Sequence, residues 1–478
     1  TKDPKLFPPP EGGTQMINRK KRAQIYKTYK AQIHEPLQKV LLNPNDEKHQ
    51  FARNAVNLAK LEFDAVEQAR LLQCVVYDDL PQVIERAVDD ENIEVAVTTE
   101  FVAAGEAIKF VGGKIDLAND ANLTITSGNG PIEVSGVAGV SDETVSINAG
   151  TSSVKIGDVG DSSHAEIHNL TISGDAGITL TGNIYTSADS SSAGDVTFND
   201  KVIIDGTVSI DTDNTGDTTA TDGIIKFTTS IQSETNGTDS LTLTSGAGTI
   251  TLPEIGGSSK PLTSFVATSN ALTISNDITT TGLIDINAPI TLGDNVTVSS
   301  GASGAGNVEF SSTVTGSYEL DILSGSGSVT ITGDIGLAGT PLTTLDINAT
   351  NTTGQTGGIT LSGRIGTDSA VGAGISTLGN PKTTGTITLG GADYNTSGAQ
   401  TFTAAAFSLT GADVTFATSN DAVEFAASTG QGGDVTLADI SDLTINSGTA
   451  GITFGGDILG TDSGVSTDVT LNSSGAVS

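Results

Sequence analysis

The residues best suited to binding a ligand lie in an acidic stretch, DTDNTGDTTATD, at positions 211–222. Five oxygen-bearing residues follow the spacing of a calcium-binding loop: Asp211, Asp213, Thr215, Asp217 and Asp222. Gly216 stands at the pivot of this loop, and oxygen ligands suit a hard cation, so calcium is the cofactor that the stretch would bind. The Thr at the third ligand position and the flanking strand patterns depart from the usual loop. An ordinary acidic insertion loop is the alternative.

A second candidate metal site is the segment HAEIH at 164–168. In a strand, His164, Glu166 and His168 would point to the same side, because side chains alternate between the two faces. The segment lacks the helical H-E-x-x-H spacing and has no evident further ligand. A solvent-facing row of side chains is the more economical interpretation.

Catalytic groups are sparse in the rest of the chain. A polysaccharide lyase would need Arg, Lys or bound calcium to neutralise a carboxylate, yet Arg364 is the only arginine after Arg86. Most Asp residues occupy turn positions, where they are favoured for conformational reasons. Trp is absent, so platforms for stacking sugar rings are poor. The sequence therefore predicts a protein that is not an enzyme.

The charge of the chain is strongly negative and unevenly distributed. The formal net charge is −34 over 478 residues. Residues 1–100 hold 14 Lys and Arg against 16 Asp and Glu, whereas the remaining residues hold 8 against 40. Because phosphate contacts need Lys and Arg, nucleic acid is excluded as a partner of this surface. An acidic surface stays soluble by self-repulsion and attracts cations.

The pattern of the chain changes near residue 92. Residues 1–18 contain FPPPEGG, which predicts an extended Pro-rich arm. Residues 19–92 show apolar residues at helical spacing, which predicts a small α-helical module for assembly or anchoring. From 93 to 478 the apolar residues recur at every second position, as in strands. No apolar run of about 18 residues is present, so no transmembrane segment is expected.

One phrase recurs in this long third region. LTLTSGAGTITL at Leu241 has relatives that begin at Leu123, Leu170, Leu320 and Leu443. Each relative reads as strand, Ser/Gly corner and strand, and the starts suggest a unit of about 24 residues. Such a unit has room for three short strands and three turns, which is one coil of a parallel β-solenoid, or β-helix. Glycine is expected where the corners need a positive φ.

The solenoid makes a specific prediction about the core. The apolar residues that share one phase should point inward: Leu123, Ile125, Leu170, Ile172, Leu241, Leu243, Leu320, Ile322, Leu443 and Ile445. The competing interpretation is a chain of small β-sandwiches built from hairpins, since SGAG can also close a hairpin. The units are too short for sandwich domains and lack a repeated core aromatic. We therefore expect a mainly β fold, a long parallel β-solenoid with a small N-terminal helical module.

Segments of this region resemble the repeats of filamentous haemagglutinin-like exoproteins. The resemblance is carried by TTTGLIDINAPITLGDNVTVSS, GNVEFSSTVTGSYELDILSGSGSVTITGDIGLAGTPLTTLDINA and YNTSGAQTFTAAAFSLTGADVTF, and it covers roughly residues 100–478. It implies an exported β-helix used for adhesion or cell-surface structure. No export-recognition domain of the two-partner type is apparent, and the predicted helical module occupies the N-terminus instead.

These observations together predict a secreted, non-enzymatic structural protein at the cell surface. It would self-assemble as a subunit of a surface layer, sheath or extracellular filament, with itself as the main partner. An adhesin that binds cell-surface glycans or the envelope through one face is the first alternative. A phage or viral fibre, or a carbohydrate-active β-helix, is the second. The strand pattern persists at Val469, Leu471 and Val477, so we expect further chain or another subunit to cover that end.

Overall fold

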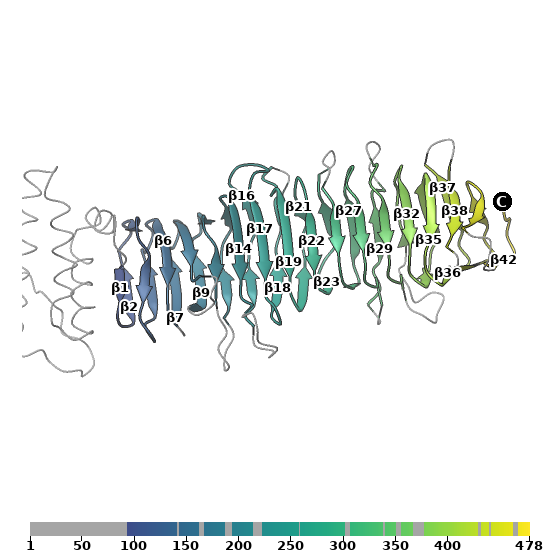
Figure 1. The fold of residues 1–478 in the computed structure, drawn as a ribbon. Helices are drawn as coiled ribbons and strands as arrows, with labels where there is room; N and C mark the ends of the chain where they lie inside the picture. Colours follow the sequence, from purple (N-terminus) through teal and green to yellow (C-terminus); the bar gives the residue numbers. More distant parts are fainter. Residues whose placement is uncertain are drawn as a thin grey trace, which may run out of the picture. The chain divides into compact units, whose positions relative to one another are not determined.

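The computed structural model describes residues 93–140, 143–161, 167–186, 194–213, 222–257, 259–301, 306–337, 340–349, 355–366, 377–428, 432–438, 441–461 and 467–478. The predicted arm and helical module lie outside the described residues, so both stay predictions. The chain divides into two compact units, Thr1–Asp189 and Ser190–Ser478. In each unit the described residues form a parallel β-solenoid, which confirms the predicted fold class (Figure 1).

In the first unit, each coil contributes to three faces, and two of the strands extend over two faces each. One face contains β1 (Ile93–Val95), β4 (Ile115–Leu117), the ends of β6 (Ile132–Ala138) and β8 (Ser153–Val159), and β11 (Ile184–Tyr185). The next face contains β2 (Thr99–Val102), β5 (Leu123–Thr126), β7 (Glu143–Asn148) and β9 (Ile167–Ser173). The last face contains β3 (Ile108–Phe110), the starts of β6 and β8, and β10 (Gly177–Leu180).

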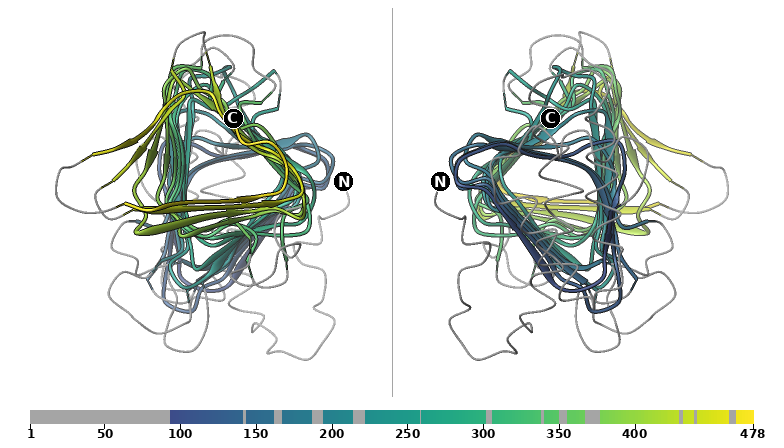
Figure 2. Two further views of the ribbon diagram at one scale, coloured as in Figure 1. Left: turned by 90° about the vertical axis from the view of Figure 1, so that its right-hand side faces the viewer. Right: turned by 90° about the vertical axis from the view of Figure 1, so that its left-hand side faces the viewer.

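The second unit repeats this three-sided coil, and we number its faces in chain order. Face 1 contains β12 (Val196–Phe198), β15 (Ile225–Phe227), β18 (Thr249–Leu252), β20 (Ala271–Ile274), β23 (Ile290–Leu292), β26 (Val314–Thr315), bridges at Ile335 and Ile365, β33 (Asp393–Asn395), β36 (Asp413–Ala417), β39 (Asp442–Gly448) and β42 (Val469–Ser473). Figure 2 looks along the stacked coils and shows the three sides.

Faces 2 and 3 are stacked in the same parallel way. Face 2 contains β13 (Val202–Ile204), β16 (Ile231–Ser233), a bridge at Ile255, β21 (Ile278–Thr279), β24 (Val296–Ser299), β27 (Glu319–Leu323), β29 (Thr344–Ile347), β31 (Thr377–Leu378), β34 (Gln400–Ala404), β37 (Val423–Ala427) and β40 (Ile452–Phe454). Face 3 contains β14 (Thr207–Asp211), β17 (Ser240–Thr244), β19 (Ser264–Thr268), β22 (Ile284–Asn287), β25 (Val308–Phe310), β28 (Val329–Ile331), β30 (Ile359–Leu361), β32 (Thr386–Leu389), β35 (Ala406–Leu409), β38 (Asp434–Leu437) and β41 (Ile458–Gly460).

The predicted inward residues form the core of each unit. All ten of them are at most 1 % exposed to solvent. Strands in register place Ile, Leu and Val of successive coils in contact, and the burial of each such side chain stabilises the fold by about 1.5–3 kcal/mol. The strand pairs that join successive coils are parallel, so the hairpin alternative is wrong.

The related phrases do not share one face of the second unit. Leu241 lies in β17 on face 3, Leu320 in β27 on face 2, and Leu443 in β39 on face 1. The length of a coil also varies, because Leu241 pairs with Phe265 whereas Thr330 pairs with Thr360. The unit of about 24 residues is therefore an average length. The phrase indicates a strand that ends in a corner, and it occurs on all three faces of the coil.

The Ser/Gly corner is held by two hydrogen bonds in the coil that contains Ser324. The Ser324 hydroxyl is buried and donates to the Gly327 carbonyl at 2.9 Å, and the Gly327 N–H donates to the Ser324 carbonyl at 2.9 Å. Asn348 of the next coil donates from Nδ2 to the Ser324 Oγ at 3.1 Å. Because buried polar groups need partners, Ser at this position is part of the core rather than a solvent-facing residue.

Glycine is required at one line of corners for a reason that differs from the predicted one. A Cβ on Gly327 would lie 2.0 Å from the Gly306 carbonyl oxygen, and a Cβ on Gly357 would lie 2.0 Å from that of Gly327. None of these three glycines, which we name the glycine column, has a positive φ. The close approach of successive coils excludes a side chain there. At the Ser/Gly corners themselves the predicted reason holds, because Gly128, Gly246, Gly325 and Gly448 all have a positive φ.

Aromatic side chains stack in the core of residues 394–454, although no repeated core aromatic was expected. Phe425 lies between Phe402 and Phe454, with ring centroids 5.5 Å away on each side and nearly parallel planes. The rings of Phe407 and Phe416 are nearly perpendicular to the same ring, with ring centroids 5.2 Å from its centroid. The three faces therefore join at this point through one group of rings, which we name the aromatic stack.

Candidate functional site

The structure brings together part of the predicted calcium loop. Asp211 ends β14, Asp213 follows it, and Asp222 lies before β15. Thr215 and Asp217 lie outside the described residues. The Asp211 carboxylate accepts a hydrogen bond from the Asp213 N–H at 2.9 Å, which is a local turn contact.

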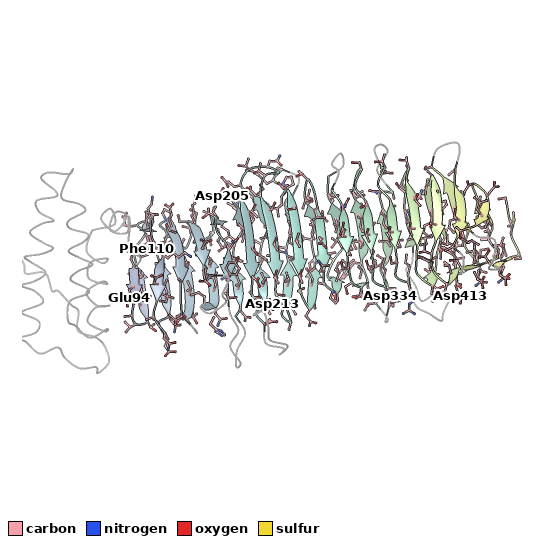
Figure 3. The ribbon with its side chains drawn as sticks, viewed as in Figure 1. Glu94, Phe110, Asp205, Asp213, Asp334 and Asp413 are labelled. Carbon is pink, nitrogen blue, oxygen red and sulfur yellow. The ribbon has the colours of Figure 1, made fainter. Side chains whose placement is uncertain are left out.

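Two carboxylates of the predicted loop meet at the corner of the following coil. A Cβ built on Gly246 would lie 2.3 Å from Asp222 Oδ2 and 2.7 Å from Asp213 Oδ1. Asp213 is labelled in Figure 3. Gly246 has a φ of +48°, and the neighbouring Ala247 N–H donates to Asp222 Oδ2 at 2.7 Å. Within the described residues, three or more His, Cys, Asp or Glu side chains do not meet in a metal-binding arrangement. The calcium site therefore stays a prediction.

We expect calcium to raise the melting temperature of the protein, because a ligand that binds only the folded state stabilises it. The measurement is thermal unfolding with calcium and with a chelator. Asp213→Asn should remove most of the difference, since it takes one negative charge from the loop. Asp294→Asn, which changes an exposed carboxylate elsewhere in the unit, is the matched control and should leave it unchanged. Equal melting temperatures with calcium and chelator would exclude the site.

The second predicted metal segment is only partly described. His168 lies in β9, where the structure places it in a half-buried position. His164 and Glu166 lie outside the described residues. The prediction that these three side chains face the same way therefore stays untested.

The most unusual electrostatic feature is a pair of carboxyls on face 2 that the sequence did not single out. Asp321 of β27 and Asp346 of β29 are register partners on adjacent coils, and we name them the acidic pair. Adjacent parallel strands lie about 4.8 Å apart, so two outward side chains in register are close neighbours. Asp321 Oδ1 is shielded from solvent and accepts no hydrogen bond among the described residues.

Burial and nearby carboxyls alter the acidity of this pair. Burial, followed by the charges of Asp346, Glu319 and Asp277, raises the pKa of Asp321 from its ordinary value of 3.8 to about 6. Burial and the charge of Glu319 also raise the pKa of Asp346. A like charge and a low dielectric both disfavour the ionised form, which explains the direction of both shifts.

A weaker version of the same arrangement lies on face 3. Asp285 of β22 and Glu309 of β25 are register partners on adjacent coils. Burial and the charge of Glu309 raise the pKa of Asp285, while a hydrogen bond with Asn287 opposes the shift. Stacking places carboxyls next to each other wherever two coils carry an acid at the same outward position.

Asp239 shows the opposite behaviour because it is hydrogen-bonded. Its carboxylate accepts bonds from the Gly206 N–H at 2.8 Å, the Thr235 N–H at 3.1 Å and the Ser233 hydroxyl. Burial alone would raise the pKa of Asp239, but these donors hold it below its ordinary value. This carboxylate fixes the turn between β16 and β17, so we assign it a structural role.

Arg364 forms an ion pair with an acid on the preceding coil. Its guanidinium Nη2 lies 3.1 Å from Asp334 Oδ2, and its backbone N–H donates to Asp334 Oδ1 at 2.7 Å. Asp334 is labelled in Figure 3. Both side chains are about one-third exposed or less. The contact joins two coils of face 1 at their bridges, Ile335 and Ile365.

In comparisons with protein-family models, curated proteins and solved structures, the chain matches none of them. A search of the described residues for helices finds none that is long and apolar enough to cross a membrane. Function must therefore be inferred from the parallel β-solenoid and from the groups on its outer faces.

The acidic pair could have been found from the sequence by aligning coils. LDIL at 320–323 and LDIN at 345–348 carry Asp at the same place between two inward residues. If the two segments stack, their aspartates must be neighbours, because the inward residues fix the register. The alternation of apolar residues does not by itself reveal that these two segments, 25 positions apart, stack in register.

Proposed function

We propose that the protein is a secreted, non-enzymatic structural protein of the cell surface that assembles with itself. The observation that supports this role is the unbroken stacking of coils in the second unit. On face 3, parallel hydrogen bonds join each strand from β14 to β41 to the next one. Such a body is a repetitive scaffold that can be lengthened coil by coil.

The outward residues of the solenoid support the same proposal. Thr273, Thr291 and Thr315 occupy one outward line on face 1. Thr330, Thr360 and Thr388 occupy one on face 3. Threonine is β-branched, which suits a strand, and its hydroxyl is compatible with water. The outer sides of these faces are therefore suited to contact with solvent. The net charge of −34 keeps such surfaces apart unless a specific junction joins them.

The resemblance of residues 100–478 to filamentous haemagglutinin-like repeats supports an extracellular location. Those exoproteins are β-helices used for adhesion and surface structure. Within this proposal the subunit belongs to a surface layer, sheath or extracellular filament, and the predicted helical module at 19–92 makes the junctions. An adhesin with a binding face on the same scaffold is the second candidate, and the same resemblance favours it.

Negative-stain electron microscopy of the native material is the test of this function. The full chain is expected to form a regular lattice or fibre. Deleting residues 1–92 is expected to leave folded β protein that no longer assembles, because the acidic faces repel each other without a junction. Circular dichroism checks that the truncated protein retains its strands.

A shorter deletion serves as the matched control for this test. Removing only residues 1–18 takes away the Pro-rich arm and leaves the predicted helical module, so assembly should persist. If the protein without residues 1–92 forms the same polymer as the full chain, the helical module is not the assembly element. If the full chain stays monomeric and instead binds cells or glycans, the adhesin proposal is favoured.

A further inference from the structure

The Asn-x-Ser/Thr triplet, which is the acceptor signal for N-linked glycans, recurs in this Thr-rich chain. Four of the triplets also have an acidic residue two positions before the asparagine: those of Asn122, Asn236, Asn348 and Asn395. An enzyme that reads only the local sequence would treat these four segments alike. What distinguishes them is the conformation and exposure of each segment in the folded chain.

Two of the four asparagines are buried in the second unit. Asn348 is 1 % exposed, and its side-chain amide is hydrogen-bonded to Ser324 of the preceding coil at both the oxygen and the nitrogen. Asn395 ends β33 and is 5 % exposed. A glycan is bulky and is attached at the surface, so neither asparagine can be modified while the unit is folded.

Asn122 of the first unit is exposed, but its triplet belongs to the parallel ladder. It immediately precedes β5, and Thr124, the hydroxyl residue of the triplet, lies within that strand. The Asn122 Oδ1 accepts a hydrogen bond from the Thr144 N–H of the next coil at 2.7 Å, and its backbone carbonyl accepts one from the Thr99 N–H at 2.8 Å. An enzyme could bind this triplet only after the strand had opened locally, which costs free energy.

The remaining described triplets are restrained in similar ways. The Asn295 Oδ1 accepts a hydrogen bond from the Glu319 N–H at 3.0 Å, and Asn472 donates from Nδ2 to the Asn446 Oδ1 at 2.8 Å. Asn169 is half-buried within β9. In each case the amide or the backbone of the asparagine is part of a strand or of a contact between coils.

Asn236 has a different setting. Its triplet, Asn236–Gly237–Thr238, lies wholly in the turn between β16 and β17, at the corner where faces 2 and 3 of the second unit meet. Asn236 is exposed, and within the described part of the chain its side-chain amide makes no hydrogen bond. Glu234, Thr235 and Thr238 are exposed as well, so the triplet belongs to a run of solvent-facing residues.

The backbone of this turn is nevertheless well held. The Asp239 carboxylate fixes one end of it, as described above. The Gly237 N–H donates to the Pro261 carbonyl at 2.9 Å, and the Gly237 carbonyl accepts from the Thr263 hydroxyl at 2.7 Å. Gly237 has a φ of +68°, a conformation that favours glycine. The Asn236 amide is therefore presented to solvent without any opening of a strand.

We propose that the folded protein accepts an N-linked glycan at Asn236. The Asn236 amide nitrogen attacks the anomeric carbon of a lipid-linked oligosaccharide, which is the donor. A C–N bond forms, the bond between the anomeric carbon and the diphosphate oxygen breaks, the amide nitrogen loses one proton, and the lipid diphosphate leaves. The glycan covers the corner between faces 2 and 3 with a bulky hydrophilic group. This inference goes beyond the proposed structural role and holds whether or not the chain assembles.

The test incubates the purified full chain with an oligosaccharyltransferase and a lipid-linked oligosaccharide, and mass spectrometry of its peptides locates the product. The folded wild type is expected to gain a glycan at Asn236. Occupancy there should be at least about tenfold higher than at Asn122, where the ladder must first open. When the protein is digested into peptides before the reaction, Asn122, Asn348 and Asn395 should be modified as well, because the fold no longer protects them.

Variants of the same triplet identify the acceptor. Asn236→Gln should remove the glycan, and so should Thr238→Val, which lacks the hydroxyl of the triplet but keeps the shape of the side chain. Thr238→Ser should keep the glycan. Asn270→Gln changes an exposed asparagine outside any triplet and is the matched control, so occupancy at Asn236 should not change.

Two outcomes overturn the proposal. One is a folded wild type that accepts no glycan at Asn236, and the other is equal occupancy of Asn122 and Asn236 in the folded chain. Circular dichroism checks that each variant retains its strands. The comparison of the two asparagines in the wild type decides the question even if a variant fails to fold.

Discussion

Gly357→Ala is expected to destabilise the second unit by about 3 kcal/mol or more, or to prevent its folding. The added Cβ would lie 2.0 Å from the carbonyl oxygen of Gly327, and 2.3 Å from its carbonyl carbon. Both are backbone atoms of the preceding coil, so no flexible side chain can move aside. The ladder between β28 and β30 would have to open. Urea denaturation followed by circular dichroism measures the loss.

The adjacent residue provides a control for this prediction. A Cβ on Gly358 would have the Thr386 carbonyl oxygen as its nearest atom, at 3.3 Å, so a shift of a few tenths of an ångström accommodates it. Neither Gly357 nor Gly358 has a positive φ, and both changes remove the same backbone freedom. Gly358→Ala should therefore cost less than about 1 kcal/mol. Equal losses for the two variants would show that coil-to-coil approach is not what selects glycine.

Phe425→Ala is expected to reduce the free energy of unfolding by about 3–5 kcal/mol. The side chain is fully buried and contacts rings from all three faces of the second unit. Removing it leaves a cavity at the centre of the aromatic stack and ends the ring contacts on both of its sides. Tyr394, which stacks on Phe416 at 4.8 Å, supplies a fluorescence signal close to the change.

Two further variants separate packing from general effects of substitution. Phe425→Leu keeps much of the volume and should cost less than Phe425→Ala. Tyr318→Ala alters an aromatic residue that is 37 % exposed and should change the free energy of unfolding by about 0.5 kcal/mol or less. A loss for Phe425→Ala no larger than that for Tyr318→Ala would mean that the stack does not stabilise the fold.

The solenoid was predictable because alternation over short segments is a local signal. Leu241 and Leu243 flank Thr242, and the two-residue period alone determines which of them points inward. The Ser/Gly corners then limit the length of each strand. The parallel stacking followed from the short repeat, and the burial of all ten predicted residues confirms the inference.

Which segments stack on each other was not predictable in the same way. Ser324 and Ser447 both begin corners, but Ser324 follows a strand of face 2 and Ser447 belongs to β39 of face 1. The three sides of the coil are chemically alike, so the sequence of a corner does not reveal its side. Insertions also change the length of individual coils, which hides the register between them.

The candidate sites show the same limit. A calcium loop is a local motif, so its residues could be named, and the structure places Asp213 and Asp222 near the same corner. The acidic pair and the glycine column depend on contacts between residues that are more than 20 positions apart. Their causes, like-charge repulsion and lack of space for a Cβ, appear only when the coils are stacked.

The direction of the ladder hydrogen bonds has a consequence for mechanics. In the second unit these bonds run from coil to coil, so a force that pulls the coils apart acts first on the outermost ladder. The coils would then detach one after another rather than all together. Between Leu241 and its partner Phe265, one coil stores 24 residues, or roughly 80 Å of extended chain. A stretched molecule would lengthen in steps of this size and absorb work at each step, as an extensible tether does.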